Sequence, residues 1–440
     1  MKLLFLAHRI PYPPNKGDKI RSYHELRAFA DRGHEVHLLA FADDLRDLQH
    51  QVELARWCAT VRIIRLRKFW ARLRALMTVL FARPLSVGYF GSRKVARIVK
   101  QALAQQGVEQ EFDAIFVYSS VMVQYVPAEW RSRTIVDLVD VDSEKWREYS
   151  ERTSFPESWL YRIEASRLRK YEHEIVSRFA SAILTTQREA ALLSDLDEFT
   201  RRARLHVISN GVDLDGFRPD ETSARAAANP SSSRYPFSTA SNNTFVPRLV
   251  FTGAMDYYAN IEAVEWFVSA ILPIIRQQEP MTEFLIVGSN PTARVKKLAS
   301  QPGVTVTGFV EDVRPYLLDA TVCVVPLRIA RGVQNKLLEA MACGKAVVAT
   351  PQSAAGLHPR NGQDLLLAEN PDDFAAAVLM VIRNATLRES LGWNARSFVE
   401  AEHHWQPLLQ RLTDLAESIV QRPTNSAESQ SRRIRSIGRH

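Results

Sequence analysis

The residues best suited to chemistry in this sequence lie close together, in a loop and the first turns of a predicted helix. They are Arg328, Arg331, Gly332, Asn335, Lys336 and Glu339. A helix N-terminus offers unpaired N–H groups and a partial positive charge, both of which favour phosphate, and Arg331 and Lys336 add full charges. Glu339 lies one turn after Asn335 and Lys336, so its carboxylate can reach a hydroxyl group next to the phosphate. A nucleotide with its ribose fits this description.

Two predicted strands position this loop and helix. Thr321–Pro326 is a short run of β-branched residues, and Ala346–Ala349 is a second buried run. Between them the spacing of Leu337, Ala340 and Met341 predicts a helix over Gln334–Cys343, which Gly344 ends. Strand, loop, helix and strand in this order place the helix N-terminus at the carboxyl end of a strand.

The start of the chain has the same order of elements. Lys2–Ala7 and Glu35–Phe41 are predicted strands, and Arg21–Asp31 between them is a predicted helix. This is the opening of a doubly wound α/β domain, in which ligands bind beyond the carboxyl ends of the strands. The loop over 8–24 should therefore face a cleft, and its candidates are Gly17, Asp18, Lys19 and Arg21. The alternative is a rigid crossover loop whose charges are solvated.

A group of aspartates marks the end of another predicted strand, Arg133–Val139. Asp137, Asp140 and Asp142 should share one face, and like charges so placed raise one another's pKa. Asp140 or Asp142 is then a candidate to orient or deprotonate a hydroxyl group of a substrate. The alternative is that Asp142 and Ser143 cap the next helix.

The order of elements predicts two α/β domains, each a Rossmann-like doubly wound parallel sheet, facing each other across a cleft. Residues 1–220 form the first domain, 221–247 a flexible linker or loop, and 248–404 the second domain. A helix over 405–421 is expected to pack back on the first domain, and 422–440 to be disordered.

The charge is concentrated in one region. The 440 residues carry a net charge of +8 and are 46% hydrophobic. Leu54 to Val108 contains no Asp or Glu but twelve Lys and Arg, so the remainder is net negative. The three cysteines match no disulfide or metal spacing and suit a reducing cytosol, and no uninterrupted apolar run is long enough to span a membrane.

A basic amphipathic helix is predicted inside this acid-free region. Its apolar face would carry Leu66, Phe69, Trp70, Leu73, Leu76, Met77 and Leu80, and its basic face Arg65, Arg67, Lys68, Arg72 and Arg74. Aromatic residues opposite bases are typical of helices that lie on anionic membranes. The alternatives are a helix packed on the sheet with its basic face in water, and a nucleic-acid surface, for which no recognised module is present.

The stretch around Glu339 resembles the signature of retaining family 4 glycosyltransferases, which have the GT-B fold. Leu-Glu-Ala-Met-Ala-Cys-Gly-Lys-Ala-Val-Val follows that family's pattern, and Gly-x-x-x-Lys-x-x-Glu-Ala-Met is like a variant of it. The resemblance implies that Glu339 contacts the donor ribose. Arg331 stands where the family has a first glutamate, which departs from the common pattern.

Further implications of the resemblance concern the donor and the acceptor. Gly17 and Gly253 would approach the donor, and Asp18, Lys19 and Arg21 would lie on the acceptor side. Arg328, Arg331 and Lys336 would replace an absent Arg/Lys pair at the diphosphate. Asp140 and Asp142 stand where the family usually has a histidine. Pro-Tyr-Pro-Pro-Asn-Lys-Gly-Asp-Lys and Asp-Val-Asp-Ser-Glu-Lys-Trp are similar to sugar transferases of exopolysaccharide and exosortase (PEP-CTERM) systems.

The expected function is therefore a hexosyltransferase. It would move a sugar from a nucleotide-diphosphate donor to a lipid-linked or polysaccharide acceptor, with retention and without a metal or other cofactor. We expect it in the cytoplasm, on the inner face of the plasma membrane, with no nucleic-acid partner. A sugar-nucleotide epimerase of the same fold and a catalytically inactive membrane-associated subunit are the alternatives.

Overall fold

A computed structural model describes residues 1–14, 16–104, 112–193, 204–219 and 245–421. The chain divides into two compact units. Unit 1 comprises Met1–Leu184, Leu193–His206 and the chain from Leu409, and unit 2 comprises Thr185–Leu192 and Val207–Leu408. The predicted tail and nearly all of the predicted linker lie outside the described residues.

Unit 1 is built on a seven-stranded sheet in the order β3-β2-β1-β4-β5-β6-β7. Its strands are β1 Lys2–Ala7, β2 Glu35–Ala42, β3 Thr60–Arg65, β4 Ala114–Tyr118, β5 Thr134–Val139, β6 Ser181–Leu184 and β7 Leu205–Val207. The strands from β3 to β6 in this order pair in parallel, as predicted. Strand β1 lies between β2 and β4, with Leu3 beside Val36 and Ala114.

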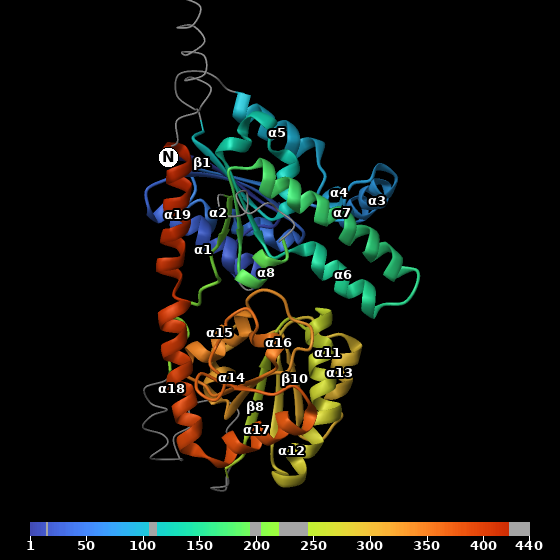
Figure 1. The fold of residues 1–440 in the computed structure, drawn as a ribbon, viewed down its shortest axis with the longest axis vertical. Helices are drawn as coiled ribbons and strands as arrows, with labels where there is room; N and C mark the ends of the chain where they lie inside the picture. The colour runs from blue at the N-terminus through green and yellow to red at the C-terminus, as the bar shows by residue number, and fades with distance from the viewer. Residues whose placement is uncertain (15, 105–111, 194–203, 220–244, 422–440) are drawn as a thin grey trace, which may run out of the picture. The chain divides into compact units, whose positions relative to one another are not determined.

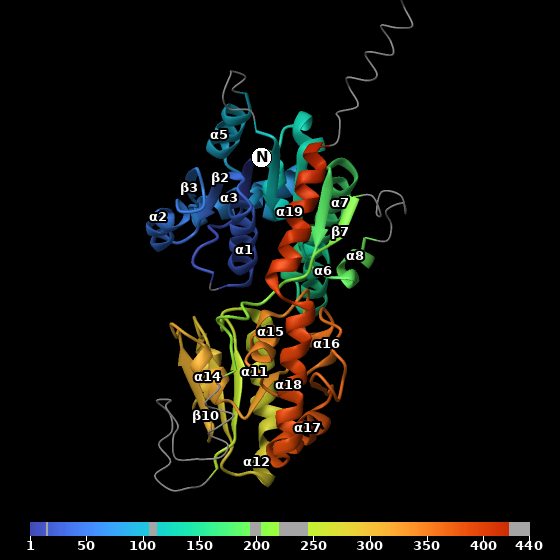
Figure 2. The same ribbon diagram turned by 90° about the vertical axis from the view of Figure 1, so that its left-hand side faces the viewer.

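Helices surround this sheet (Figure 1). They are α1 Gly17–Asp31, α2 Gln51–Leu54, α3 Lys68–Thr78, α4 Leu85–Tyr89, α5 Arg93–Ala104, α6 Asp142–Arg152, α7 Glu157–Arg178 and α19 Trp405–Gln421. Short 3-10 turns cover Leu45–His50, Val79–Phe81, Ser120–Tyr125 and Ala128–Arg133. Figure 2 shows α19 beside α1, where Arg32 at the end of α1 pairs with Asp414 at 2.6 Å and Glu417 at 2.9 Å.

Helix α1 begins at Gly17, four residues before the predicted start. The acidic Asp18 in its first turn is favourable beside the positive end of the helix, and its carboxylate accepts a hydrogen bond from the Lys19 N–H at 3.0 Å. Gly17, Asp18 and Lys19 therefore lie in the helix, whereas the sequence placed them in the preceding loop.

The strand with the aspartates is also different from the prediction. Only Asp137 lies in β5; Asp140 follows the strand, and Asp142 is the first residue of α6. Val139 has a φ of 68°, a left-handed conformation that breaks the alternation of side chains. The prediction that the three aspartates share one face of a strand is therefore wrong.

Unit 2 contains a six-stranded sheet in the order β10-β9-β8-β11-β12-β13. Its strands are β8 Arg248–Thr252, β9 Glu283–Val287, β10 Val304–Gly308, β11 Val322–Val325, β12 Val347–Ala349 and β13 Leu366–Leu367. Its helices are α8 Gln187–Ala191, α11 Tyr258–Trp266, α12 Leu272–Gln278, α13 Ala293–Leu298, α14 Arg314–Asp319, α15 Asn335–Ala342, α16 Pro351–Ala354, α17 Pro371–Arg383 and α18 Ala385–Glu402.

The strand order reverses between β8 and β11, which are direct neighbours in this sheet. Figure 1 shows α11 and α13 on one side of the strands and α14 and α15 on the other. The helices that follow β8 and β11 therefore begin at the same edge of the sheet from opposite faces. This is the switch point at which doubly wound sheets bind their ligands.

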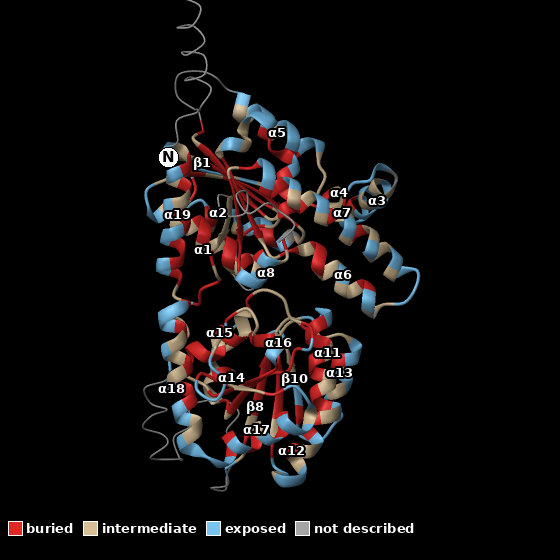
Figure 3. Ribbon diagram, in the orientation of Figure 1, coloured by how far each residue is buried: buried red, intermediate tan, exposed pale blue. Residues whose placement is uncertain are grey.

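The core of unit 2 is apolar and continuous. Figure 3 shows its strands as buried, and Phe251, Phe267 and Phe284 are among its fully buried side chains. A π-helical segment over Phe267–Ile271 joins α11 to α12, so that Tyr258–Gln278 is long and apolar enough to cross a membrane by length and composition. Of that apolar window, 56% is buried, and Val264, Phe267 and Ile271 belong to the core cluster.

Candidate functional site

The N-terminus of α15 lies at the switch point of unit 2 and has no side-chain cap. Gln334 precedes the helix, and its Nε2 donates to the Arg331 carbonyl at 2.7 Å, which closes the loop before the helix. Gly332 adopts a φ of 58°, which a residue with a side chain adopts at a cost. The chain thus turns sharply into a helix end whose N–H groups favour an anion.

Lys336 is fixed across the switch point by the opposite helix. Its Nζ donates to Asn260 Oδ1 at 2.9 Å and lies 5.2 Å from the centre of the Phe251 ring. Asn260, in α11, is itself held because its Nδ2 donates to the Ala254 carbonyl at 2.9 Å. Burial lowers the pKa of Lys336 to about 8, while neighbouring Glu339 acts in the opposite direction.

Glu339 lies one turn further along α15 and is partly exposed. Burial raises the pKa of its carboxyl to about 7, and the charge of Lys336 opposes this shift. An ammonium and a carboxyl group, both with pKa values near neutrality, therefore lie together at the helix end. Perturbed pKa values of this kind cluster at functional sites.

Gly253 lets the backbone after β8 lie close to Lys336. A Cβ at this position would lie 2.8 Å from Asn260 Nδ2 and 3.4 Å from Lys336 Cε. At the end of β9, a Cβ on Gly288 would lie 1.7 Å from the Gly253 carbonyl oxygen, so this approach also needs glycine. The absence of side chains leaves backbone at the edge of the sheet, as close contact with a phosphate requires.

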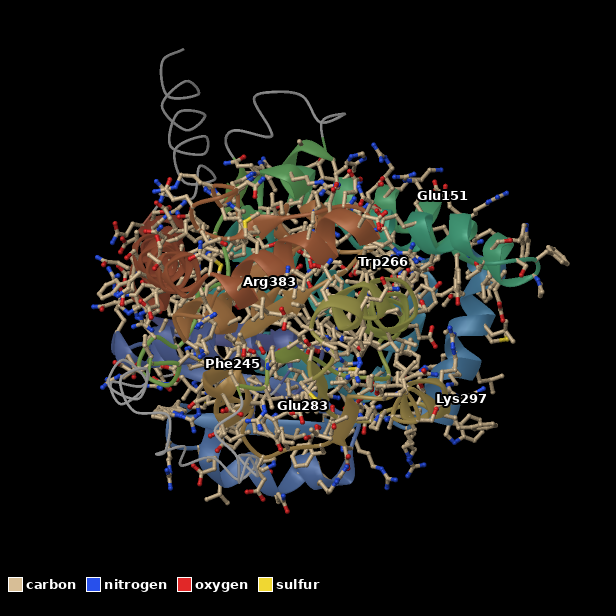
Figure 4. The ribbon with its side chains drawn as sticks, turned by 90° about the horizontal axis from the view of Figure 1, so that it is seen from below. Glu151, Phe245, Trp266, Glu283, Lys297 and Arg383 are labelled. Carbon is tan, nitrogen blue, oxygen red and sulfur yellow. The ribbon has the colours of Figure 1, made fainter. Side chains whose placement is uncertain are left out.

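Both arginines of the loop are held by carboxylates. The Arg328 guanidinium donates to Glu262 and stacks 4.9 Å from the ring centre of Trp266, which is labelled in Figure 4. Arg331 Nη1 lies 3.3 Å from Oε1 of Glu189, whose side chain is only 2% exposed. Contacts of either arginine with a diphosphate remain predictions.

Asn335 is held by Asn210, which follows β7. Its Oδ1 accepts a hydrogen bond from Asn210 Nδ2 at 3.2 Å, and the Asn210 carbonyl lies 2.9 Å from His403 Nδ1. The next residue, Gly211, lies against Trp405: a Cβ there would approach the Trp405 ring to 2.6 Å. The chain at Asn210-Gly211 therefore supports the N-terminal end of α15.

In unit 1, the predicted acceptor-side residues form ion pairs. Asp18 lies 2.6 Å from Arg9 Nη1 and 3.6 Å from His8 Nε2. Lys19 and Arg21 are both buried. Lys19 Nζ is 2.9 Å from Asp47.

Arg21 connects α1 to β5. Its Nε lies 2.6 Å from Asp137 and 3.0 Å from Glu25, both buried. Burial, and next the charge of Asp137, raise the pKa of Glu25 well above its usual value. This geometry gives Arg21 a structural role, and contact of Asp18, Lys19 or Arg21 with an acceptor remains a prediction.

Asp140 and Asp142 lie beyond the carboxyl end of β5, both partly exposed. Asp137 Oδ1 accepts the Val139 N–H at 2.8 Å, so the buried carboxylate supports the strained residue just before Asp140. Asp142 lies 3.7 Å from Lys145. Val141 is the N-cap residue of α6 without a side-chain cap, so the capping alternative does not describe this helix.

Three residues that the sequence did not single out support the candidate site. Asn260 holds Lys336, Glu189 holds Arg331, and Asn210 holds Asn335. Asn260 lies in the first turn of α11 and Asn210 follows β7, but nothing in the local residue pattern indicates which side chain either of them contacts. Glu189 lies in a short helix without any distinguishing sequence signal.

The structure changes the predicted basic helix of unit 1. Arg65 ends β3 and Arg67 is the N-cap residue of α3, so neither lies on the basic face of the helix as predicted. Leu66 is buried, whereas Phe69, Trp70 and Leu73 are exposed. Lys68 and Arg72 lie in α3 and are exposed. Side-chain placement at Leu80 lies outside the described residues.

The described part of the chain contains no group of three or more His, Cys, Asp or Glu that could hold a metal ion. Its cysteines, Cys58, Cys323 and Cys343, are buried and free. Independence from metals remains a prediction about the reaction.

Comparison with known proteins gives a family match over the part of the chain that carries α15. Residues 246–384, which include all of α15, match the family model described as glycosyl transferases group 1. An uncharacterised glycosyltransferase of Methanocaldococcus jannaschii is 25% identical over 181 residues, 39% of this chain and 45% of that protein. The matched region therefore spans less than half the length of this relative.

Two solved structures share the fold over nearly the whole chain. Sucrose-phosphate synthase from Thermosynechococcus elongatus has a TM-score of 0.67 and 19% identity, covering 95% of this chain and 99% of that one. Anabaena HepE in complex with UDP has a TM-score of 0.65 and 16% identity, covering 95% and 100%. The fold is GT-B, and its second unit carries the match to the group 1 glycosyl transferases.

Proposed function

We propose that the protein is a glycosyltransferase that uses a nucleoside-diphosphate sugar as donor. The observation that carries the proposal is the uncapped start of α15 at the switch point, with Lys336 and Glu339 on it. The match of residues 246–384 to group 1 glycosyl transferases supports this assignment. The Anabaena protein of the same fold was solved with UDP, which supports UDP as a first probe.

In this proposal each residue of the site acts on a different part of the donor. Lys336 and the N–H groups of α15 bind the diphosphate, and Glu339 accepts hydrogen bonds from the ribose hydroxyls. During transfer the bond between the sugar and the diphosphate breaks, and negative charge develops on the leaving diphosphate. A helix end and an ammonium group fixed in advance stabilise that charge without reorganisation.

The finer parts of the proposal follow the family resemblance. We propose a family 4 hexosyltransferase of the exopolysaccharide or exosortase-associated type, which retains the anomeric configuration and needs no metal. Unit 1 would present a lipid-linked or polysaccharide acceptor, with Asp140 or Asp142 orienting or deprotonating its hydroxyl. We propose that it works in the cytoplasm as a peripheral protein on the inner face of the plasma membrane, without a nucleic-acid partner.

Incubation with a panel of radiolabelled nucleotide sugars and a lipid-linked acceptor tests the reaction. Radiolabel should move to the acceptor with one or more donors, and the anomeric configuration of the product tests retention. Interconversion of free nucleotide sugars would instead identify an epimerase. Inertness with every donor, in protein that binds no UDP, would identify an inactive subunit and overturn the proposal.

A further inference from the structure

Helix α3 leaves its apolar face in water. We call Phe69, Trp70, Leu73, Leu76 and Met77 the α3 face; their exposed fractions are 73%, 52%, 45%, 63% and 51%. Ala71 is the one buried residue of this helix. A helix of a globular domain normally buries its apolar stripe, and an exposed cluster of this kind marks an interaction surface. The alternative in which this stripe packs on the sheet is therefore wrong.

Polar contacts, rather than the apolar stripe, hold α3 to unit 1. Arg167 of α7 donates to the carbonyl groups of Thr78 at 3.2 Å and Val79 at 2.8 Å, just at the end of the helix. Glu164, about one turn earlier in α7, accepts hydrogen bonds at 2.7 and 2.9 Å from Ser86 of α4, whose Gly88 lies against Thr78 of α3. The α3 face therefore remains available while the helix is fixed at its C-terminal end.

The surroundings of the α3 face select an anionic partner. Arg65, Arg67, Lys68, Arg72 and Arg74 are all exposed. No Asp or Glu occurs from Leu54 to Val108. Exposed aromatic residues among bases bind the boundary between lipid head groups and acyl chains. A nucleic acid or an acidic peptide would use the bases but not Phe69, Leu73 and Leu76.

A basic hollow lies at the N-terminal end of α3, where β2 and β3 end. It has a volume of about 480 Å³, and its lining includes Asp43, Asp44, Arg65, Arg67, Lys68 and Phe69. Asp44 is bound by Arg46 at 2.7 Å. Asp43 lies 3.9 Å from Arg9 and 3.8 Å from Lys68. Within the described residues, Arg65 and Arg67 make no ion pair, so the hollow keeps uncompensated positive charge.

The start of α3 adds to this charge. Arg67 is its N-cap residue and no side-chain hydrogen bond caps the helix. The positive end of the helix, with its uncapped N–H groups, therefore lies at the same hollow that Arg65 and Arg67 line. A phosphate group fits such a combination of bidentate donors and backbone donors.

We propose that the basic hollow binds the phosphate head of an anionic lipid whose hydrocarbon chains lie along the α3 face. The occupant is a lipid, because the hollow and the apolar face are continuous through Phe69, which contributes to both. The inference rests on the proposed function in one respect. A lipid-linked acceptor that carries phosphate would be a substrate of this class, held beside the carboxyl edge of the unit 1 sheet.

Vesicle sedimentation with the full chain tests the proposal. One set of phosphatidylcholine vesicles contains phosphatidic acid, and a second contains oleate at matched surface potential, which supplies charge without phosphate. Binding to phosphatidic acid should be at least tenfold tighter than binding to oleate. Equal binding to both, or binding to neither, overturns the proposal.

Variants separate the head group from the chains. Arg65→Ala with Arg67→Ala should remove the preference for phosphatidic acid, with a loss of about tenfold or more in binding. The matched control, Arg93→Ala with Lys94→Ala, removes two exposed bases of α5 in the same acid-free region and should keep the preference. Equal losses of vesicle binding in the two variants would show that only net charge matters and would contradict the proposal that the hollow binds the head group.

Two further measurements identify the source of the phosphate and isolate this site from the donor site. Phe69→Ser with Trp70→Ser should abolish binding to vesicles while a short-chain phosphatidic acid below its micelle concentration still binds. If inorganic phosphate displaces the protein completely from phosphatidic acid vesicles, the hollow binds a free anion and the proposal of a lipid ligand is wrong. UDP affinity should be the same in all these variants as in the wild-type protein, because the proposed donor site lies in unit 2. If the wild-type protein does not bind UDP, the proposed function is contradicted but the lipid site is not.

Discussion

At the residue scale, Lys336 and Glu339 carry opposite charges, and burial disfavours the charged form of both side chains. The pKa of Lys336 falls to about 8 and that of Glu339 rises to about 7. Both groups are charged together only in a narrow range between these values. If the ammonium binds a diphosphate and the carboxylate binds a ribose, this range should control donor affinity.

The affinity for UDP should therefore be highest between about pH 7 and pH 8. Below this range Glu339 gains a proton and loses its charge, and above it Lys336 loses a proton and its charge. Calorimetric titration across pH measures both limbs. A flat profile would contradict the assignment of these two residues.

Conservative variants assign each limb of the profile. Glu339→Gln should remove the decrease on the acidic side and weaken binding at pH 7.5 about tenfold or more, the value of a hydrogen bond to a charged group. Lys336→Arg keeps a positive charge and should shift the decrease on the alkaline side to higher pH, because an arginine remains protonated.

Gly253 supplies a second test at the residue scale. In Gly253→Ala the new Cβ would lie 2.8 Å from Asn260 Nδ2, so Asn260 must move and its hydrogen bond to Lys336 must change. UDP affinity should decrease several-fold, a loss of about 1 kcal/mol, while the melting temperature changes little. Calorimetry and thermal unfolding measure the two effects; unaltered affinity would show that the position of Lys336 does not matter.

At the element scale, Arg21 fastens α1 to the end of β5. It lies between Asp137 and Glu25, and all three side chains are nearly inaccessible to solvent. Asp137 in turn accepts the Val139 N–H and supports the left-handed residue before Asp140. Helix α1 and strand β5 therefore position the loop that carries Asp140, one of the two residues proposed to act on the hydroxyl group of the acceptor substrate.

Arg21→Met should destabilise unit 1 by about 3–5 kcal/mol, because it leaves the Asp137 carboxylate buried without its partner charge. The free energy of unfolding from urea melts measures this change. The control is Arg178→Met, which breaks an exposed pair with Glu174 and should cost less than about 1 kcal/mol. Similar losses in the free energy of unfolding for the two variants would show that the buried pair contributes no more to stability than an exposed one.

At the scale of the whole molecule, the chain crosses from unit 2 to unit 1 twice. After the last strand of unit 2, α18 stays with that unit, whereas the chain from Leu409 in α19 belongs to unit 1. Leu412, Ala416 and Ile419 of α19 are buried. Each unit has its own sheet and core, so the two can unfold separately.

Thermal unfolding should therefore show two transitions with different sensitivities. UDP at a hundred times its dissociation constant should stabilise the transition of unit 2 by about 2.7 kcal/mol and leave the other in place. A chain ending at Leu408 loses the buried residues of α19 and should lower the transition of unit 1 alone. Calorimetric scans test both; a common shift of the two transitions would show that the units unfold together.

The sequence by itself determined the two parallel α/β sheets and the local geometry of the proposed donor site. Strands such as Lys2–Ala7 were placed correctly, because apolar runs and helical spacing are local signals. Lys336 and Glu339 could be placed on one side of a helix for the same reason, since three residues make about one turn.

Only the tertiary structure decided which distant groups meet. Asn260 holds Lys336 across 76 positions of sequence, and Glu189 holds Arg331 across 142. The burial of Arg21 and the exposure of Trp70 were likewise decided by neighbouring elements. Such contacts depend on how β8 and β11 become neighbours and on what covers each helix, and no local pattern of residue types encodes either.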